Sequence, residues 1–140
     1  MSSQGPETLQ PPGWPRPKGY SNGIATAGRQ VFLSGQIGWD ADGRFPAKDL
    51  AGQVRKTLEN IVAILATIDG KPEHVVRLTW FITSRDEYNA QLREIGAAYR
   101  EVMGKHFPCM SVVQVVALME VEAKVEIEAT AVLPQLNSTP

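Results

Sequence analysis

The sequence predicts an α+β fold in which two helices cover one face of a single mixed sheet. The apolar residues recur at a period of two in some segments and at steps of three and four in others, which gives the element order β-β-α-β-α-β-β. The chain has 140 residues, of which 43% are hydrophobic, and this suits one domain better than two. No stretch approaches the ~18 consecutive apolar residues of a membrane-spanning helix.

The first two strands are predicted at residues 24–27 and 30–34, around a tight turn that uses the permissive backbone of Gly28. Upstream, residues 1–17 predict an extended arm, because five of the ten prolines lie there and proline disfavours helices and central strands. The folded domain is expected over residues 18–133, followed by a short polar tail at 134–140.

The first helix is predicted from Asp49 onward, where apolar residues recur at steps of three and four until Gly70. A second helix of about five turns is predicted up to Gly104, since Ser84 and Glu87 have the spacing of a capping box. Both helices carry one apolar stripe, so both are expected to pack on the same face of the sheet.

Three more strands are predicted. In residues 74–83 the period of two places Val76, Leu78, Trp80 and Ile82 on one face. The last two strands are predicted at 110–119 and 124–133, joined by a polar turn. Because 110–119 is apolar on both faces and no third helix is available to cover it, another copy of the chain is expected to do so. The sequence therefore predicts a homo-oligomer.

Composition excludes several classes of function. A net charge of −1 gives no basic footprint for nucleic acid. The lone Cys109 excludes an internal disulfide and a CxxC site, and two histidines are too few for the usual metal-ligand spacings. The first residues lack the features of a secretory signal, so a cytoplasmic location is expected.

A few side chains are candidates for chemistry. Glu126 and Glu128 share one face of the last strand, either as a solvated edge or with one carboxylate in an oligomer cleft, holding a water. Cys109 is a possible nucleophile, although a small buried thiol is the favoured reading. The hydroxyl groups of Tyr20 and Ser34 either form hydrogen bonds within turns or line a pocket. The segment 35–38 is interpreted as a bend or bulge at the end of a strand rather than as a phosphate loop.

In order along the chain, several blocks resemble the successive signatures of the Rid family, also called the YjgF/YER057c/UK114 family. These blocks are residues 18–23, 31–37, 53–60, 77–82, 106–108 and 124–129. The resemblance covers residues 18–133 and implies a chorismate-mutase-like subunit that assembles as a homotrimer with clefts between neighbours. Active members hydrolyse reactive enamines and imines to keto acids and ammonia, without metal or cofactor.

The resemblance also implies roles for individual residues. Tyr20, Ser34 and Glu126 match positions that line the cleft, with Glu126 as the partner of the attacking water, and Cys109 lies beside the same wall. Active deaminases carry an arginine that grips the substrate carboxylate, and here Met110 stands in its place. A family asparagine is likewise replaced by Gly96.

Since a thioether offers neither charge nor donor, the usual small 2-imino acid is expected to bind poorly or in another pose. The expected function is then a deaminase of a different, larger or more apolar enamine or imine, such as a 2-aminomuconate-type intermediate of aromatic degradation. The alternative is a non-catalytic trimer that binds a small molecule or docks a partner. Nuclease activity conflicts with the acidic balance, because phosphate contacts need cations. Arg77, Arg100 and the arginine of the proline arm stay open as replacements for the missing one.

Overall fold

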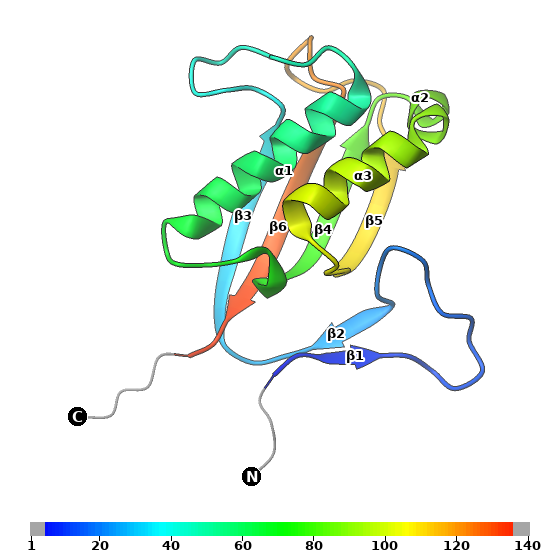
Figure 1. Cartoon of the computed structure of the whole chain (residues 1–140), viewed down its shortest axis with the longest axis vertical. Helices are drawn as coiled ribbons and strands as arrows, with labels where there is room; N and C mark the ends of the chain where they lie inside the picture. Colours follow the sequence, from blue (N-terminus) through cyan, green and yellow to red (C-terminus); the bar gives the residue numbers. More distant parts are fainter. Residues whose placement is uncertain (1–4, 136–140) are drawn as a thin grey trace.

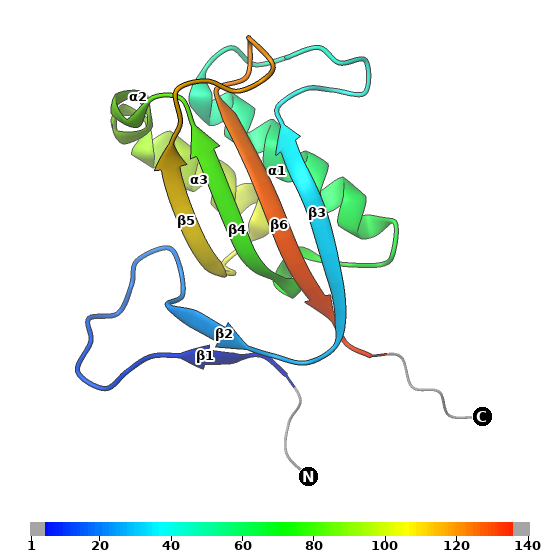
Figure 2. The same cartoon turned by 180° about the vertical axis from the view of Figure 1, so that it is seen from behind.

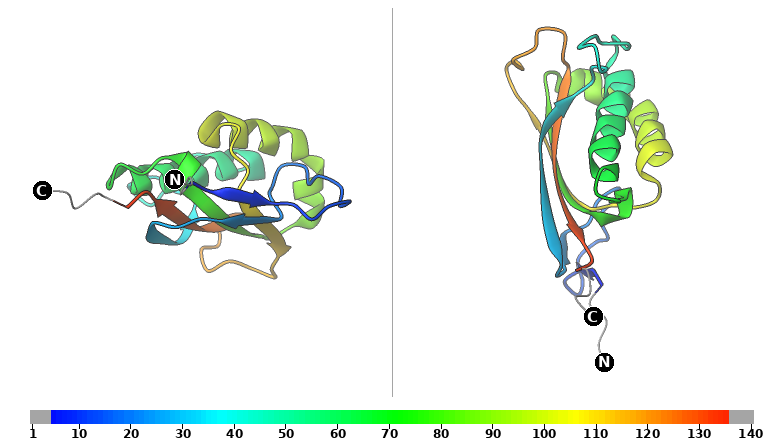
Figure 3. Two further views of the ribbon diagram at one scale, coloured as in Figure 1. Left: turned by 90° about the horizontal axis from the view of Figure 1, so that it is seen from below. Right: turned by 90° about the vertical axis from the view of Figure 1, so that its left-hand side faces the viewer.

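The computed structural model describes residues 5–135 and confirms the α+β class. One four-stranded sheet is covered on one face by helices, and the other face is open (Figures 1 and 3). The predicted tail therefore lies almost entirely outside the described residues. The elements are β1 (Glu7–Leu9), β2 (Gly23–Ala25), β3 (Arg29–Ile37), α1 (Leu50–Ala66), η1 (Pro72–His74), β4 (Val75–Ile82), α2 (Arg85–Ala90), α3 (Leu92–Met103), β5 (Cys109–Gln114) and β6 (Val125–Leu133).

The main sheet is mixed, with the strand order β3-β6-β4-β5. β4 and β5 are parallel, and β6 is antiparallel to both of its neighbours. The parallel pair needs a crossover, which α2 and α3 provide on the same face as α1 (Figure 1). The last strand of the chain is thus an interior strand of the sheet.

The N-terminal region differs from the prediction. β2 does not pair with β3 but with β1, three residues inside the proline-rich arm, as a separate antiparallel ribbon (Figure 2). Gly28 lies between β2 and β3 as predicted, at φ +151°. A Cβ atom there would be 2.2 Å from the carbonyl oxygen of Leu133, so glycine is required by close approach to β6 as well as by its dihedral angle.

The predicted second helix is in fact two helices, α2 and α3, which meet at Gln91. The Ser84 hydroxyl accepts a hydrogen bond from the backbone N–H of Glu87, as the capping pattern predicts. Gln91 has φ −112° and ψ 20°, which interrupts the helix, and its side-chain oxygen accepts a hydrogen bond from the N–H of Ala51 at the start of α1. The break therefore satisfies an otherwise unpaired N–H group of another helix.

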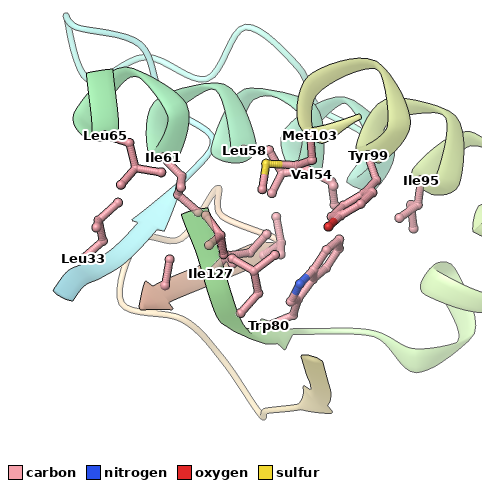
Figure 4. Packing of buried hydrophobic residues seen from close by; sticks show 14 of the residues in the cluster. Leu33, Val54, Leu58, Ile61, Leu65, Trp80, Ile95, Tyr99, Met103 and Ile127 are labelled. Carbon is pink, nitrogen blue, oxygen red and sulfur yellow. The ribbon is translucent and has the colours of Figure 1, made fainter. Parts of the chain in front are cut away.

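The core lies between α1, α3 and the sheet, as Figure 4 shows. Val54, Leu58, Ile61 and Leu65 of α1 are fully buried, as their spacing predicts. On β4, however, a register irregularity between Val75 and Arg77 turns Val75 into the core. Val76 is therefore only partly buried, although the predicted alternation groups it with the buried Leu78, Trp80 and Ile82.

Two polar side chains within residues 5–135, Gln53 and Thr57, are also buried. The amide of Gln53 donates to the carbonyls of Ala47 and Glu122 and accepts from the N–H of Lys124. These bonds attach α1 to the loop between β5 and β6. No helix within residues 5–135 is long and apolar enough to cross a bilayer.

β5 is shorter than predicted, because the chain leaves the sheet after Gln114 and forms a loop up to β6. Val116, Met119 and Val121 of this loop are more than nine-tenths exposed. Figure 2 shows the open face of the sheet. Phe32, whose neighbour Leu33 is buried, is 73% exposed, and Val113 of β5 is 43% exposed. The sequence predicts an apolar surface that no helix of the same chain covers. Such a surface is present, partly on the open face of the sheet and partly on this loop.

Candidate functional site

The segment that carries Tyr20 is attached to the start of β5. The backbone N–H of Ser21 donates to the carbonyl of Pro108 at 3.1 Å, and the Ser21 hydroxyl donates to the carbonyl of Phe107 at 2.5 Å. Ser21 and Cys109 form an isolated parallel bridge. Tyr20 is thereby fixed beside Cys109 and Met110, although it is 90 residues away along the chain from Met110.

Tyr20 and Met110 line one cavity of about 410 Å³. Its walls come from the segment before β2, from α2 and α3, and from β4 and β5, and they are largely aromatic and aliphatic. The lining residues are Lys18, Gly19, Tyr20, Trp80, Tyr88, Leu92, Ile95, Gly96, Tyr99, Arg100, Phe107, Met110 and Val112. This volume is within the range of pockets that hold small organic ligands.

The polar groups of this cavity are few. The Tyr99 hydroxyl donates to the carbonyl of His106 at 2.5 Å, and burial raises the pKa values of Tyr88 and Tyr99. Within residues 5–135, the indole Nε1 of Trp80 is buried and makes no hydrogen bond. Lys18 and Arg100 are the two cationic side chains in the lining. The cavity is therefore an apolar site with two positive charges.

Gly96 and Arg100 are one helical turn apart on α3 and face the same cavity. A Cβ atom on Gly96 would be 3.3 Å from Nη1 of Arg100 and 4.0 Å from Cζ, so the guanidinium lies over the glycine. In the described part of the chain, no carboxylate is within 4.0 Å of Arg100, since the ion pairs there join other residues. The Arg100 charge is unpaired in this structure.

Cys109 and Met110 also border a second, smaller cavity of about 180 Å³, which Arg77 lines as well. Arg77 is the register partner of Cys109 on β4. The Cys109 thiol is half-buried rather than fully buried as favoured from the sequence. The His106 ring is hydrogen-bonded to the carbonyl of Val75. Among residues 5–135, Cys109 therefore has no histidine partner.

Ser34 and Glu126 form a separate group at the junction of β3 and β6. The register between these strands shifts between Leu33 and Gln36, which confirms the bulge read from the sequence. Because Gly35 has no side chain, the Glu126 carboxyl group can lie over it: a Cβ atom there would be 2.1 Å from Oε2. Glu126 is half-buried, whereas Glu128 is exposed.

One chain does not bring all five predicted site residues together. Glu126 pairs in register with Phe81 on β4, whereas Cys109 pairs with Arg77. Four residues of β-strand separate these two partners, or roughly 13 Å at 3.3 Å per residue. Tyr20, Cys109 and Met110 therefore form one group, and Ser34 and Glu126 form another.

Sequence reasoning missed most of the cavity lining. The helical spacing predicts an apolar stripe that includes Tyr88, Leu92 and Ile95. Such a stripe does not show that its edge borders a cavity. No group of three or more metal-ligating side chains occurs in the described ranges.

Taken together, fold and cavities define a small α+β domain of the chorismate-mutase-like type, with an apolar cavity between α3 and the strands β4 and β5. Residues 15–133 match the sequence model of the family described as endoribonuclease L-PSP. The chain belongs to this family, which is also called the Rid or YjgF/UK114 family.

Two relatives illustrate the range of names in the family. The chain is 35% identical over 137 residues to the protein DfrA of Myxococcus xanthus, covering 94% of this chain and 92% of DfrA. It is 33% identical over 116 residues to a 2-iminobutanoate/2-iminopropanoate deaminase of Salmonella typhimurium, covering 81% and 86%.

Solved structures agree with the fold. The Rid-family protein YyfB of Yersinia pestis, of unknown function, superposes with a TM-score of 0.80 at 28% identity, covering 91% of this chain and 98% of YyfB. The crystal structure of Escherichia coli TdcF with bound serine has a TM-score of 0.65 at 32% identity, with 91% and 98% covered.

Proposed function

We propose that this protein is a hydrolytic deaminase that converts a reactive enamine or imine into a carbonyl compound and ammonia. The half-buried Glu126 carboxyl group, held over Gly35 on the open face of the sheet, carries the proposal. A carboxylate in such a position can accept a proton from water without a metal. The 33% identity to a named 2-iminobutanoate/2-iminopropanoate deaminase supports the same class of reaction.

The proposed reaction needs only water and proton transfer. An enamine first takes a proton on carbon to become the iminium ion, which is also the protonated form of the imine. Glu126 then accepts a proton from water as the water oxygen attacks the iminium carbon, which gives a carbinolamine. The protonated Glu126 returns this proton to the nitrogen, the C–N bond breaks, and ammonia leaves while the hydroxyl proton of the former carbinolamine passes to the Glu126 carboxylate and the carbonyl forms.

The active assembly is proposed to be a homotrimer, in which each cleft combines two neighbouring chains. One chain would supply Ser34 and Glu126, and its neighbour would supply Tyr20, Cys109 and Met110. The separation of these two groups within one chain supports this division. Exposed apolar residues on the open face and in the 115–124 loop are available for burial between copies.

The substrate is proposed to be larger or more apolar than the usual 2-imino acids. Met110 gives the cleft a flexible apolar contact where active family members carry arginine. The aromatic and aliphatic lining of the 410 Å³ cavity supports such a substrate.

The test supplies imines in situ from an amino-acid oxidase acting on leucine, phenylalanine or alanine, and measures the rate of ammonia release with and without this protein. Acceleration for leucine or phenylalanine that exceeds acceleration for alanine is expected, and Glu126→Gln should abolish it. If the protein accelerates ammonia release from none of these imines but still binds a ligand, the deaminase proposal is wrong and a binding protein is favoured.

The family name, endoribonuclease L-PSP, makes ribonuclease activity a second outcome to examine. Cleavage of single-stranded RNA by the purified protein, abolished by Glu126→Gln, would contradict the proposed function. We expect none, because the net charge of −1 offers few cations for phosphate contacts.

A further inference from the structure

We propose that Arg100 binds the carboxylate of the substrate in this protein, in place of an arginine at position 110. The inference rests on the proposed function, and it assigns a specificity-determining residue to the same cleft. It also specifies the substrate class as 2-imino acids with a branched or aromatic side chain.

The first observation is the position of the Arg100 guanidinium. Arg100 and Met110 line the same cavity from opposite elements, α3 and β5. The guanidinium lies back over Gly96, 3.3 Å from the place of a missing Cβ atom. Long helical side chains lean toward the N-terminus of their helix, so the absence of a side chain at Gly96 gives Arg100 room at the cavity wall.

The second observation is that this charge has no partner. Of the ion pairs in residues 5–135, one joins Arg55 to Glu101, the residue next to Arg100, yet none includes Arg100 itself. A planar guanidinium offers two parallel N–H groups that match a carboxylate. An unpaired arginine beside an apolar cavity is suited to an amphipathic anion.

The third observation concerns what surrounds the charge. Leu92, Ile95 and Met110 provide an aliphatic wall beside Arg100, with Tyr88 and Tyr99 as aromatic neighbours. A small 2-imino acid held by Arg100 would leave much of the 410 Å³ empty. A branched or aromatic side chain would fill this volume and cover the apolar wall.

The test measures binding and needs no turnover. Isothermal titration calorimetry compares 4-methyl-2-oxopentanoate with 4-methyl-2-pentanone, which has a methyl group where the keto acid has its carboxylate. The wild-type protein should bind the keto acid about tenfold more tightly than the ketone, as expected of a charge-assisted hydrogen-bond pair that is partly open to solvent. Arg100→Met should reduce this ratio to about one.

Two matched controls separate Arg100 from other cations. Arg93 is exposed on the same helix and does not line the cavity, so Arg93→Met should keep the ratio. Lys18 does line the cavity, and Lys18→Met should lower the ratio less than Arg100→Met. If Lys18→Met removes the preference and Arg100→Met does not, the inference is wrong. It is also wrong if the wild-type protein shows no preference or binds neither probe.

A second variant covers the case in which Arg100→Met fails to fold, as judged by its melting curve. Gly96→Leu keeps the arginine but fills the space under its guanidinium, and it should reduce the ratio of affinities severalfold. An unchanged ratio in this variant counts against the inference. Loss of the ratio in both variants, with no imine turned over by the wild type, would support Arg100 as the anchor and reject the deaminase.

Discussion

Gly35 controls the position of Glu126. Any side chain at position 35 would collide with the flexible end of the glutamate, since its Cγ, Cδ and Oε2 atoms all lie within 2.9 Å of the missing Cβ. The carboxyl group can swing away at little energetic cost, so the collision should affect chemistry more than folding. The glycine is thus a positioning residue for the proposed base.

We therefore expect Gly35→Ala to lower kcat at least tenfold on the best imine, while the melting temperature changes little. Ammonia release and a thermal melt check the two halves of this prediction. Gly43→Ala serves as a control for a glycine remote from Glu126, and it should leave kcat unchanged. A large fall in melting temperature for Gly35→Ala would show that the site serves packing instead.

In the proposed cleft, Met110 is the residue expected to select among imino acids. Restoring arginine at this position should add a second guanidinium to the cavity and favour small, strongly charged substrates. We expect Met110→Arg to raise kcat/KM for 2-iminopropanoate by about tenfold or more, in keeping with a charge-assisted bond to a carboxylate. The same assay with the imine of leucine is the control, and its kcat/KM should not rise. Equal gains for both substrates would contradict a role in selectivity.

At the scale of elements, Gln53 connects α1 to the loop that precedes β6. Its side chain is buried and satisfies two backbone carbonyls and one N–H group. We expect Gln53→Ala to lower the free energy of unfolding by about 3 kcal/mol, because these partly buried backbone groups lose their partners and a cavity remains in place of the amide. Urea denaturation measures this loss. The exposed Gln30→Ala should change it by no more than about 0.5 kcal/mol.

The stability that Tyr99 gives to the packing of α3 depends on pH. Burial raises the pKa of its hydroxyl above the ordinary value of 10.0, because the phenolate is poorly solvated there. The neutral form stabilises the fold, so this contribution is complete below about pH 10 and is lost as the pH rises through the raised pKa. Between pH 8 and pH 11, the wild-type protein should lose more stability than Tyr99→Phe, as measured by urea denaturation. Parallel losses would contradict the assignment.

The sequence predicted those elements whose apolar period is regular. The buried face of α1 follows the predicted steps of three and four, as Leu58 illustrates. The inward faces of β3 and β6 follow the period of two, as Ile127 illustrates. It did not predict the break at Gln91, because that break depends on a hydrogen bond to Ala51 in another helix. The β1–β2 ribbon was not predicted, because the prolines of the arm disfavour strands and only three residue pairs connect β1 to β2. Tyr20, Ser34 and Glu126 are expected from the sequence to line one cleft, but the separation of Tyr20 from the other two within one chain depends on the strand order.

At the scale of the whole molecule, the proposed trimer takes its two groups of site residues from two neighbouring chains. If each cleft takes Glu126 from one subunit and Tyr20 from its neighbour, subunits carrying Glu126→Gln or Tyr20→Ala are inactive alone. Random hybrid trimers of the two would recover about a quarter of wild-type activity, since each mixed trimer holds one intact cleft. Ammonia release after subunit exchange measures this. No recovery in hybrids confirmed by mass spectrometry would place the complete site within one chain.

The order β3-β6-β4-β5 has a consequence for synthesis of the chain. β3 and β4 become neighbours of a common strand only when β6 enters between them, and β6 includes residues 125–133. During translation, the residues up to the end of β6 must leave the ribosome before the sheet can close, so the nascent chain keeps the edges of β3 and β4 unpaired until β6 emerges. Premature termination before residue 125 would leave an aggregation-prone fragment rather than a smaller folded unit.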